Sequence, residues 1–154
     1  MSLLLLLSSA PGGGGGGSAA YRSSTTGTVL STTTLSITKP SGTASGDAVI
    51  LFVTLDGSSG TTITQPSGFT LGGDQFMSGP DTQRAVWYHK IAGGSEPATY
   101  DFTFSASSTG LGAAVAVSGA DATTPIKAIY RSKCHFCYAQ IVFGCCCHLL
   151  YFYN

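Results

Sequence analysis

Residues 99–105 read TYDFTFS and decide the class of fold, because aromatic and polar side chains alternate along the whole segment. A period of two places Tyr100, Phe102 and Phe104 on one face of a β-strand and the polar residues on the other. The segment therefore predicts a strand whose aromatic face points toward a core.

Strand patterns continue on both sides of this segment. Residues 48–55 form a continuous apolar run rich in β-branched side chains, as expected for a central strand that is buried on both faces. No helical period separates the strands, so we expect an all-β fold, namely an antiparallel β-sandwich of the Ig-like or jelly-roll-like kind. The predicted strand segments are 29–37, 48–55, 61–64, 69–71, 84–91, 99–105 and 111–117, and the predicted turns lie at 56–60, 66–68, 93–97 and 107–110.

The charge balance narrows the classes of partner. Only 9% of the residues are charged, and seven basic residues cancel seven acidic ones. A neutral chain without a basic stripe has no electrostatic footprint for nucleic acid or for an anionic membrane. No segment reaches the ~18 apolar residues that a membrane-spanning helix needs. Low charge with abundant Ser, Thr and Gly is common in extracellular and virion-surface proteins. We therefore expect this protein to be extracellular or on the surface of a virion.

The chain divides into three parts by composition. Residues 1–22 form an N-terminal arm with a run of leucines and a flexible linker at Gly12–Gly17. Residues 23–130 form the β-sandwich domain, and residues 131–154 form a tail rich in Cys and aromatic residues. The leucine run also resembles a signal peptide, but it lacks a basic segment and is short for one.

All five cysteines lie in the tail, so the body folds without disulfides. The candidate metal ligands are Cys134, Cys137, Cys145, Cys147 and His148, a set large enough for a tetrahedral zinc site. Disulfide pairing and inert, buried thiols are the alternatives. We expect no cofactor.

Four motifs follow one another along the body of the chain. They are Lys39-Pro40-Ser41-Gly42-Thr43 with Gly46-Asp47, then Pro66-Ser67-Gly68-Phe69-Thr70-Leu71, then Trp87-Tyr88-His89-Lys90-Ile91-Ala92 with Ser95-Glu96-Pro97, and finally Gly119-Ala120-Asp121 through Thr124-Pro125-Ile126. In this order they resemble a β-sandwich module of phage tail and fibre proteins and of uncharacterised bacterial secreted proteins. The resemblance covers about Thr28 to Ile126. It implies a fold and no catalytic residues.

No arrangement of residues predicts an enzyme. A glycoside hydrolase would need two placed carboxylates, but Glu96 lies in a Gly-Pro turn and Asp101 on an outward strand face. Trp87, Tyr88 and Tyr100 could instead form a platform for sugar rings, although such residues usually pack in a core. A carbohydrate-binding or adhesion module is therefore the alternative function.

The favoured function is a structural subunit that assembles with copies of itself. The resemblance ends at Ile126, where such modules normally continue, so we expect an open edge on the sandwich. Leu3, Leu4, Leu5, Leu6 and Leu7 could add a strand to that edge in a neighbour, which gives a head-to-tail homopolymer. Glycans are further partners, and the candidate O-glycan attachment sites are Ser23, Ser24, Thr25, Thr26, Thr32, Thr33 and Thr34.

Overall fold

The chain folds into β-strands, and no helix occurs in the part that the structure describes. This computed structural model describes residues 19–57, 60–77, 82–126, 128–133 and 146–151. The strands are β1 (Ala20–Thr38), β2 (Ala48–Asp56), β3 (Ile63–Thr64), β4 (Thr70–Met77), β5 (Gln83–Ile91), β6 (Thr99–Ser118), β7 (Ala128–Lys133) and β8 (Cys146–Tyr151). The prediction of an all-β chain is confirmed.

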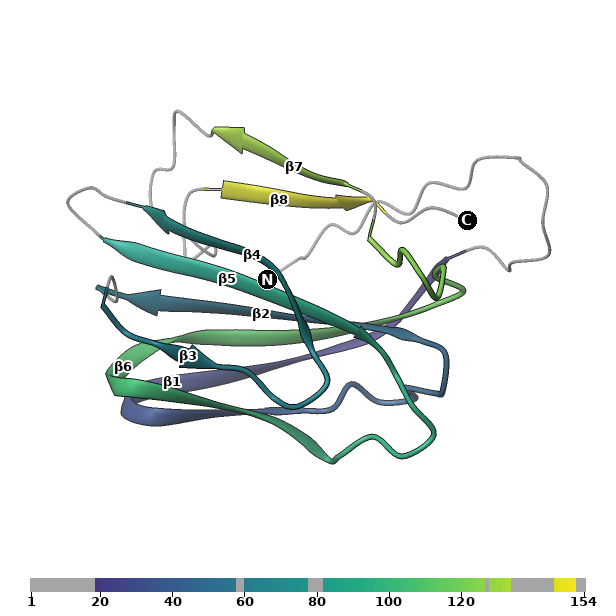
Figure 1. The fold of residues 1–154 in the computed structure, drawn as a ribbon, viewed down its shortest axis with the longest axis horizontal. Helices are drawn as coiled ribbons and strands as arrows, with labels where there is room; N and C mark the ends of the chain where they lie inside the picture. Colours follow the sequence, from purple (N-terminus) through teal and green to yellow (C-terminus); the bar gives the residue numbers. More distant parts are fainter. Residues whose placement is uncertain (1–18, 58–59, 78–81, 127, 134–145, 152–154) are drawn as a thin grey trace.

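Six of these strands form one antiparallel sheet (Figure 1). The strand order is β1-β6-β2-β5-β4, and β3 pairs with β6 beside this path. Within the described ranges, β7 and β8 pair with each other and with no further strand, as a separate antiparallel hairpin. The edge strands of the main path are therefore β1, which contains the first residues of the sheet, and β4.

β1 and β6 are long strands that bend together (Figure 1). Thr28 still pairs with Leu111, but after register shifts around Thr32 the pairing resumes between Thr34 and Thr103. Ser31, at the bend, has a φ of 51°, which is uncommon for a residue with a side chain. The bend divides the sheet into a large half (residues 20–29, 110–118, β2, β5 and β4) and a small half (residues 32–38, 99–108 and β3).

The two halves of β1 lie against each other after the bend. The Thr25 hydroxyl donates a hydrogen bond to the carbonyl of Thr38. A Cβ placed on Gly27 would lie 2.8 Å from the Ser36 carbonyl oxygen, and one placed on Gly112 would lie 2.6 Å from Ile37 Cδ1. At Gly27 the close atom belongs to the backbone, so a side chain there would force the two parts of β1 apart.

The core is one cluster of buried residues that takes apolar side chains from both halves. Its members include Leu35, Ile37, Leu51, Val53, Leu55, Val86, Tyr88, Tyr100, Phe102 and Phe104. The predicted alternation along residues 99–105 is confirmed, since Tyr100, Phe102 and Phe104 are buried and the polar residues between them are exposed. β2 is buried along most of its length, as its apolar run predicts.

Three predicted boundaries differ from the structure. The first strand, expected at residues 29–37, already begins at Ala20, because its first part pairs with the end of β6. The segment Ser107–Gly110 was expected to end a strand as a turn, but it lies inside β6, because β6 continues through the bend and keeps its pairing with β1. The strand expected at residues 69–71 extends to Met77. Its glycines at Gly72 and Gly73 concealed this extension, since glycine usually weakens a strand.

Candidate functional site

A surface groove of about 390 Å³ lies between β3 and β4, at an open border of the sheet. β4 is an edge strand, so one side of its backbone has no strand partner among the described residues. β3 is only two residues long and pairs with Thr103 and Phe104 of β6, whereas residues 110–117 of β6 pair with β2 on the same side. The residues that line the groove are Gly60, Thr61, Thr62, Ile63, Gln65, Leu71, Asp74, Arg84 and Tyr88.

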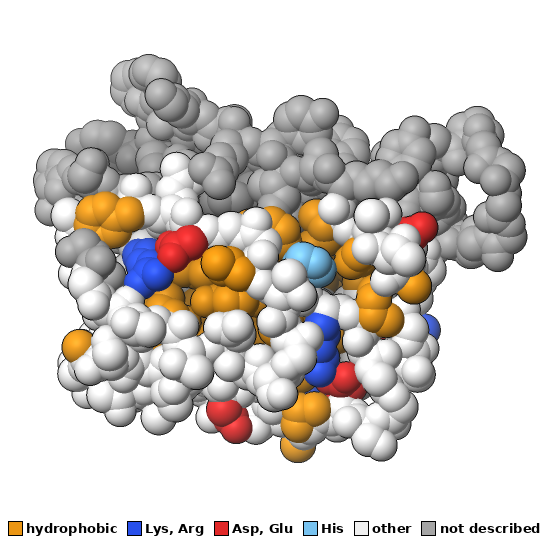
Figure 2. Space-filling model, in the orientation of Figure 1, with side chains coloured by type: hydrophobic (Ala, Val, Ile, Leu, Met, Phe, Trp, Pro, Cys, Tyr) orange, Lys and Arg blue, Asp and Glu red, His pale blue; other side chains and the backbone are white. Residues whose placement is uncertain are grey.

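Most residues that line the groove are polar, whereas three, Ile63, Leu71 and Tyr88, are apolar. Tyr88 and Ile63 are buried members of the core, so the groove reaches core side chains. Leu71 of β4 also lines the groove and is 52% exposed. Figure 2 shows hydrophobic side chains on this face of the molecule, with a basic and an acidic side chain beside them. The groove therefore offers three apolar contacts in a mainly polar lining, next to a strand edge that has no partner in the described part of the chain.

Arg84 and Asp74 form an ion pair at the rim of this groove. Arg84 Nε donates to Asp74 Oδ1 over 2.9 Å and Nη2 donates to Oδ2 over 2.5 Å, while Nη1 donates to the carbonyl of Thr61. The guanidinium thus joins β4 to the chain that leads into β3. Its hydrogen bonds lower the pKa of Asp74, and Asp74 in turn raises the pKa of Arg84, so both stay charged.

A second ion pair lies at the other end of β5 and is enclosed. Lys90 Nζ is 2.7 Å from Glu96 Oε2, which also accepts a hydrogen bond of 3.0 Å from the Tyr100 hydroxyl. The Gly93 amide donates to Glu96 Oε1 over 2.8 Å. The ammonium group lies 4.8 Å from the centroid of the Phe69 ring, close enough for a cation–π contact. This cluster fastens the β5–β6 loop to the turn before β4.

Several causes set the pKa values of this cluster. Burial alone would raise the pKa of Glu96, but the hydrogen bonds from Lys90, Gly93 and Tyr100 outweigh it and lower the pKa. Burial and the neighbouring Glu96 carboxylate raise the pKa of Tyr100 far above its ordinary value. Glu96 is therefore a carboxylate that holds a loop through three partners, the Lys90 ammonium, the Gly93 amide and the Tyr100 hydroxyl.

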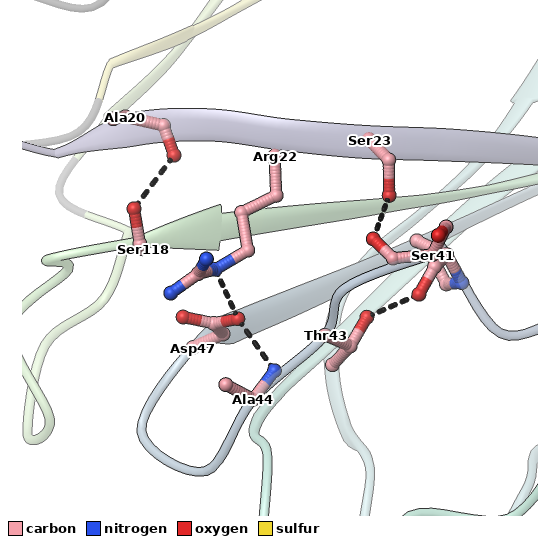
Figure 3. A network of polar contacts seen from close by, with 9 residues as sticks. Ala20, Arg22, Ser23, Ser41, Thr43, Ala44, Asp47 and Ser118 are labelled. Carbon is pink, nitrogen blue, oxygen red and sulfur yellow. Dashed lines mark hydrogen bonds and ion pairs between the residues drawn. The ribbon is translucent and has the colours of Figure 1, made fainter.

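A third polar network joins the start of β1 to the β1–β2 loop (Figure 3). Arg22 Nε lies 2.6 Å from Oδ2 of the buried Asp47, and the same oxygen accepts the Ala44 amide over 2.8 Å. The Ser23 hydroxyl donates to the Ser41 carbonyl over 2.6 Å. The first predicted motif, which contains Asp47, is thus a loop anchored to the first strand.

The four motifs of the sequence have structural explanations. Gly46 donates to the Ala92 carbonyl over 2.9 Å, and the Ala92 amide donates to the Asp47 carbonyl over 2.7 Å, which joins the first motif to the third. The Lys90–Phe69 contact joins the third motif to the second. In the fourth, Asp121 accepts the amides of residues 123 and 124 in a tight turn. All are contacts that hold loops in place.

The three aromatic residues considered for a sugar platform do not share a surface. Tyr88 and Tyr100 are buried in the core. Trp87 lies on the opposite face of β5, because neighbouring residues of a strand point to opposite sides. The hypothesis of a platform formed by these three rings is therefore wrong.

The candidate glycan sites lie on β1, where several hydroxyls already make hydrogen bonds. Ser23 and Thr25 donate to backbone carbonyls and are half-buried, and Thr32 donates to the carbonyl of Thr34. Ser24 shares a hydrogen bond of 3.1 Å with the Tyr21 hydroxyl. The exposed candidates are Ser24, Thr26, Thr32, Thr33 and Thr34.

The other candidate residues fall outside what the structure describes. Leu3 to Leu7 precede the first described residue, and Cys134, Cys137 and Cys145 lie in the gap after β7. Cys147 and His148 belong to β8, whose side chains are not described. The proposed zinc site thus stays a prediction. Within the described ranges, no helix is long and apolar enough to cross a membrane.

The sequence analysis missed Asp74 and Arg84 as a pair. Phe76 lies opposite Arg84 in the β4–β5 hairpin, and Asp74 lies diagonally two positions away on the same face. Opposite charges at this spacing are a known stabilising pair, so the signal existed in the sequence. The pair could have been predicted only if the strand expected at residues 69–71 had been extended to Met77.

Comparisons with protein-family models, curated protein sequences and solved structures returned no match to this chain. The resemblance to phage and bacterial secreted modules therefore remains an expectation from its motifs.

Proposed function

We propose that the chain is a structural subunit of an extracellular or virion-associated fibre, in which copies join head to tail. In this proposal the N-terminal leucines of one copy add a strand to the groove between β3 and β4 of the next. The folded-back sheet then acts as a β-sandwich with one open seam. The observation that carries the proposal is a groove that reaches the core residues Tyr88 and Ile63 beside β4, whose outer edge has no strand partner among the described residues.

The groove has the features that a donated strand requires. β4 offers an edge of unpaired backbone groups, and edges of that kind pair readily with another extended segment. Leu71, Ile63 and Tyr88 supply apolar contacts for alternate side chains of the incoming strand. Main-chain hydrogen bonds would then give affinity and the apolar contacts would give register, as in other strand-addition complexes.

The arm has the composition of a donor. In an extended conformation Leu3, Leu5 and Leu7 share one face, and burial of each contributes about 1.5–3 kcal/mol before ordering costs. The glycines at Gly12–Gly17 let this segment reach a neighbour at up to about 3.3–3.6 Å per residue. Since donor and acceptor are different surfaces, the contact propagates into a filament or closes into a ring.

Electron microscopy of the full chain and two matched variants tests this proposal. We expect filaments or rings from the full chain, and none after Leu71→Glu, which places a charge in the acceptor groove. Leu30→Glu is the control, because Leu30 is also an exposed leucine (71%) but lies on β1, away from the groove. It should assemble as the full chain does.

A donor variant completes the experiment. Leu3→Ser, Leu5→Ser and Leu7→Ser together should abolish assembly and leave a folded monomer by circular dichroism. Mixing this variant with Leu71→Glu should give no filament but should yield dimers, because one intact donor and one intact acceptor remain. A full chain that stays monomeric at high concentration, or assembly that survives both variants, would contradict the proposal. Binding of the monomer to a glycan array would instead favour an adhesion module.

A further inference from the structure

The large half of the sheet has a second apolar face, on the side away from the core. We define this outer face by Ile50, Phe52, Trp87, Val115 and Val117. Cross-strand pairing brings these residues together, because Phe52 lies opposite Trp87 and Ile50 lies opposite Val115. Ile50, Val115 and Val117 have no exposed surface, although they point away from the core. A sheet that is buried on both faces needs a second covering layer.

The outer face also leaves polar atoms without partners. His89 and Gln75 share this face by register, since Gln75 lies opposite Ala85, which is on the same side of β5 as Trp87 and His89. His89 Nδ1 and Gln75 Oε1 are buried, and neither makes a hydrogen bond within the described residues. Burying such atoms is costly unless another group satisfies them, so a contacting segment with polar backbone groups fits this face.

Trp87 is fitted to the outer face. A Cβ on Gly72 would lie 2.0 Å from Trp87 Cζ3, and one on Gly73 would lie 2.6 Å from Trp87 Nε1. The indole thus lies directly over the β4 backbone, with His89 beside it at 5.6 Å between ring centroids. Because Gly72 and Gly73 have no side chains, the Trp87 ring lies close to the β4 backbone. The outer face is therefore a broad apolar surface on which another layer can pack.

Two flanking segments of the chain reach this face. Ala120 and Ile126, which follow β6, both pack against it, and so does Ala19, which precedes β1. The chain enters β7 at Ala128, two residues after Ile126. By contrast, the glycines at Gly12–Gly17 separate Ala19 from the leucine run. The segment that follows Ile126 is therefore the better placed to continue across the face.

We propose that the β7–β8 hairpin docks on the outer face and forms the covering layer of the large half. Because β7 and β8 pair with each other and, among the described residues, with no strand of the main sheet, the hairpin is free to pack face to face instead of extending that sheet. In Figure 1, β4 and β5 lie between the hairpin and β3, on the side away from the small half. The N-terminal arm then stays available for a neighbouring subunit.

Trp87 is the only tryptophan of the chain and reports directly on this contact. To disrupt the hairpin, the test variant carries Ile129→Pro and Tyr130→Pro, both in β7, in the full chain. Ladder hydrogen bonds alternate between residues, so two consecutive prolines remove at least one bond of the hairpin. We expect a red shift of the Trp87 emission and faster quenching by acrylamide, at a concentration where the protein is monomeric. The control, Leu4→Pro with Leu5→Pro in the arm, should change neither.

Two results of this experiment would overturn the proposal. One is a red shift from the arm variant alone, which would assign the cover to residues 1–17. The other is an unchanged emission in both variants, which would mean that neither segment covers Trp87. If dilution of the unaltered chain shifts the emission, a second copy covers the face and the proposal is also wrong.

A cross-linking experiment decides the question if the proline variant loses its sheet by circular dichroism. Phe52 is replaced by the photoreactive p-benzoyl-phenylalanine, an aromatic substitution at a half-buried position. We expect an intramolecular cross-link to a peptide within residues 128–151, and none from the same replacement at the exposed Leu30. A cross-link from Phe52 to residues 1–17, or to a second chain, would refute the docking.

Discussion

The two ends of β5 carry similar ion pairs in opposite surroundings. At one end the Lys90 and Glu96 side chains are 15% and 6% exposed, and at the other Arg84 and Asp74 are 18% and 37% exposed. Both pairs join β5 to a neighbouring segment on the core side of the sheet. The enclosed pair has Tyr100 and Phe69 around it, whereas the open pair borders the groove.

The difference in exposure suggests different roles for the two ion pairs, one in the stability of the fold and the other in binding. Removing one partner of an enclosed pair leaves a charge without solvent or hydrogen bonds, so the fold depends on it. An exposed pair contributes little to stability, because water competes with each partner. We infer that the Glu96 end holds the fold closed and that the Asp74 end is free to serve a binding surface.

Among the substitutions that test this comparison, Glu96→Ala is expected to lower the free energy of unfolding the most. We expect a loss of about 3 kcal/mol, since the Lys90 ammonium would remain in an enclosed site without its carboxylate. Asp74→Ala should cost less than about 1 kcal/mol. Urea denaturation of both variants measures the difference. Equal losses would break the comparison between the two ends.

A smaller loss is expected when only the hydroxyl at the enclosed end is removed. Tyr100→Phe deletes one hydrogen bond to a carboxylate and should destabilise the protein by about 1.5 kcal/mol. The matched control is Tyr21→Phe, since the Tyr21 hydroxyl bonds Ser24 on the exposed surface of β1. The control should unfold at the same urea concentration as the unaltered chain.

The smallest effect distinguishes the two ends by their response to acid. The pKa of Glu96 is lower in the folded protein than its ordinary value of 4.5, so its stabilising contribution is complete above that pH. The contribution is lost as the pH falls through the folded pKa. Glu96→Gln should therefore show a weaker loss of stability on acidification than the unaltered chain. The window for Asp74 lies lower, because its ordinary value is 3.8.

A series of urea denaturation curves between neutral pH and pH ~3 would record this effect. Parallel acid sensitivity in Glu96→Gln and in the unaltered chain would mean that other groups control it.

Sequence patterns predicted the strands that have strong periodicity and missed the features that arise from bending. Residues 48–55, 84–91 and 99–105 were found because packing on the core imposes their apolar pattern. The bend within β6 could not be found, because Ser107–Gly110 has the composition of a turn whether the strand ends there or continues. What decides it is pairing with β1, which is distant in the sequence.

The candidate site was even less accessible to sequence reasoning. The groove exists because β3 is short and β4 has no outer neighbour, and both are properties of strand order. Glu96 was noted in a Gly-Pro turn without a partner, yet the loop brings it to Lys90 and Tyr100. Its position depends on where the turn returns the chain, which composition does not specify.

The pairing of β1 with β6 has a consequence for how the protein folds. Ala20 and Ser118 are partners at 98 residues' separation, so the first strand cannot pair until the last strand of the sheet has left the ribosome. Contacts so distant in sequence slow folding, and an unpaired strand that waits is exposed to aggregation. β1 is mostly Ser and Thr with few large apolar residues, a composition poorly suited to sticking to other chains. The polar composition of β1 thus lowers the risk of aggregation during the time before β6 is synthesised and can pair with it.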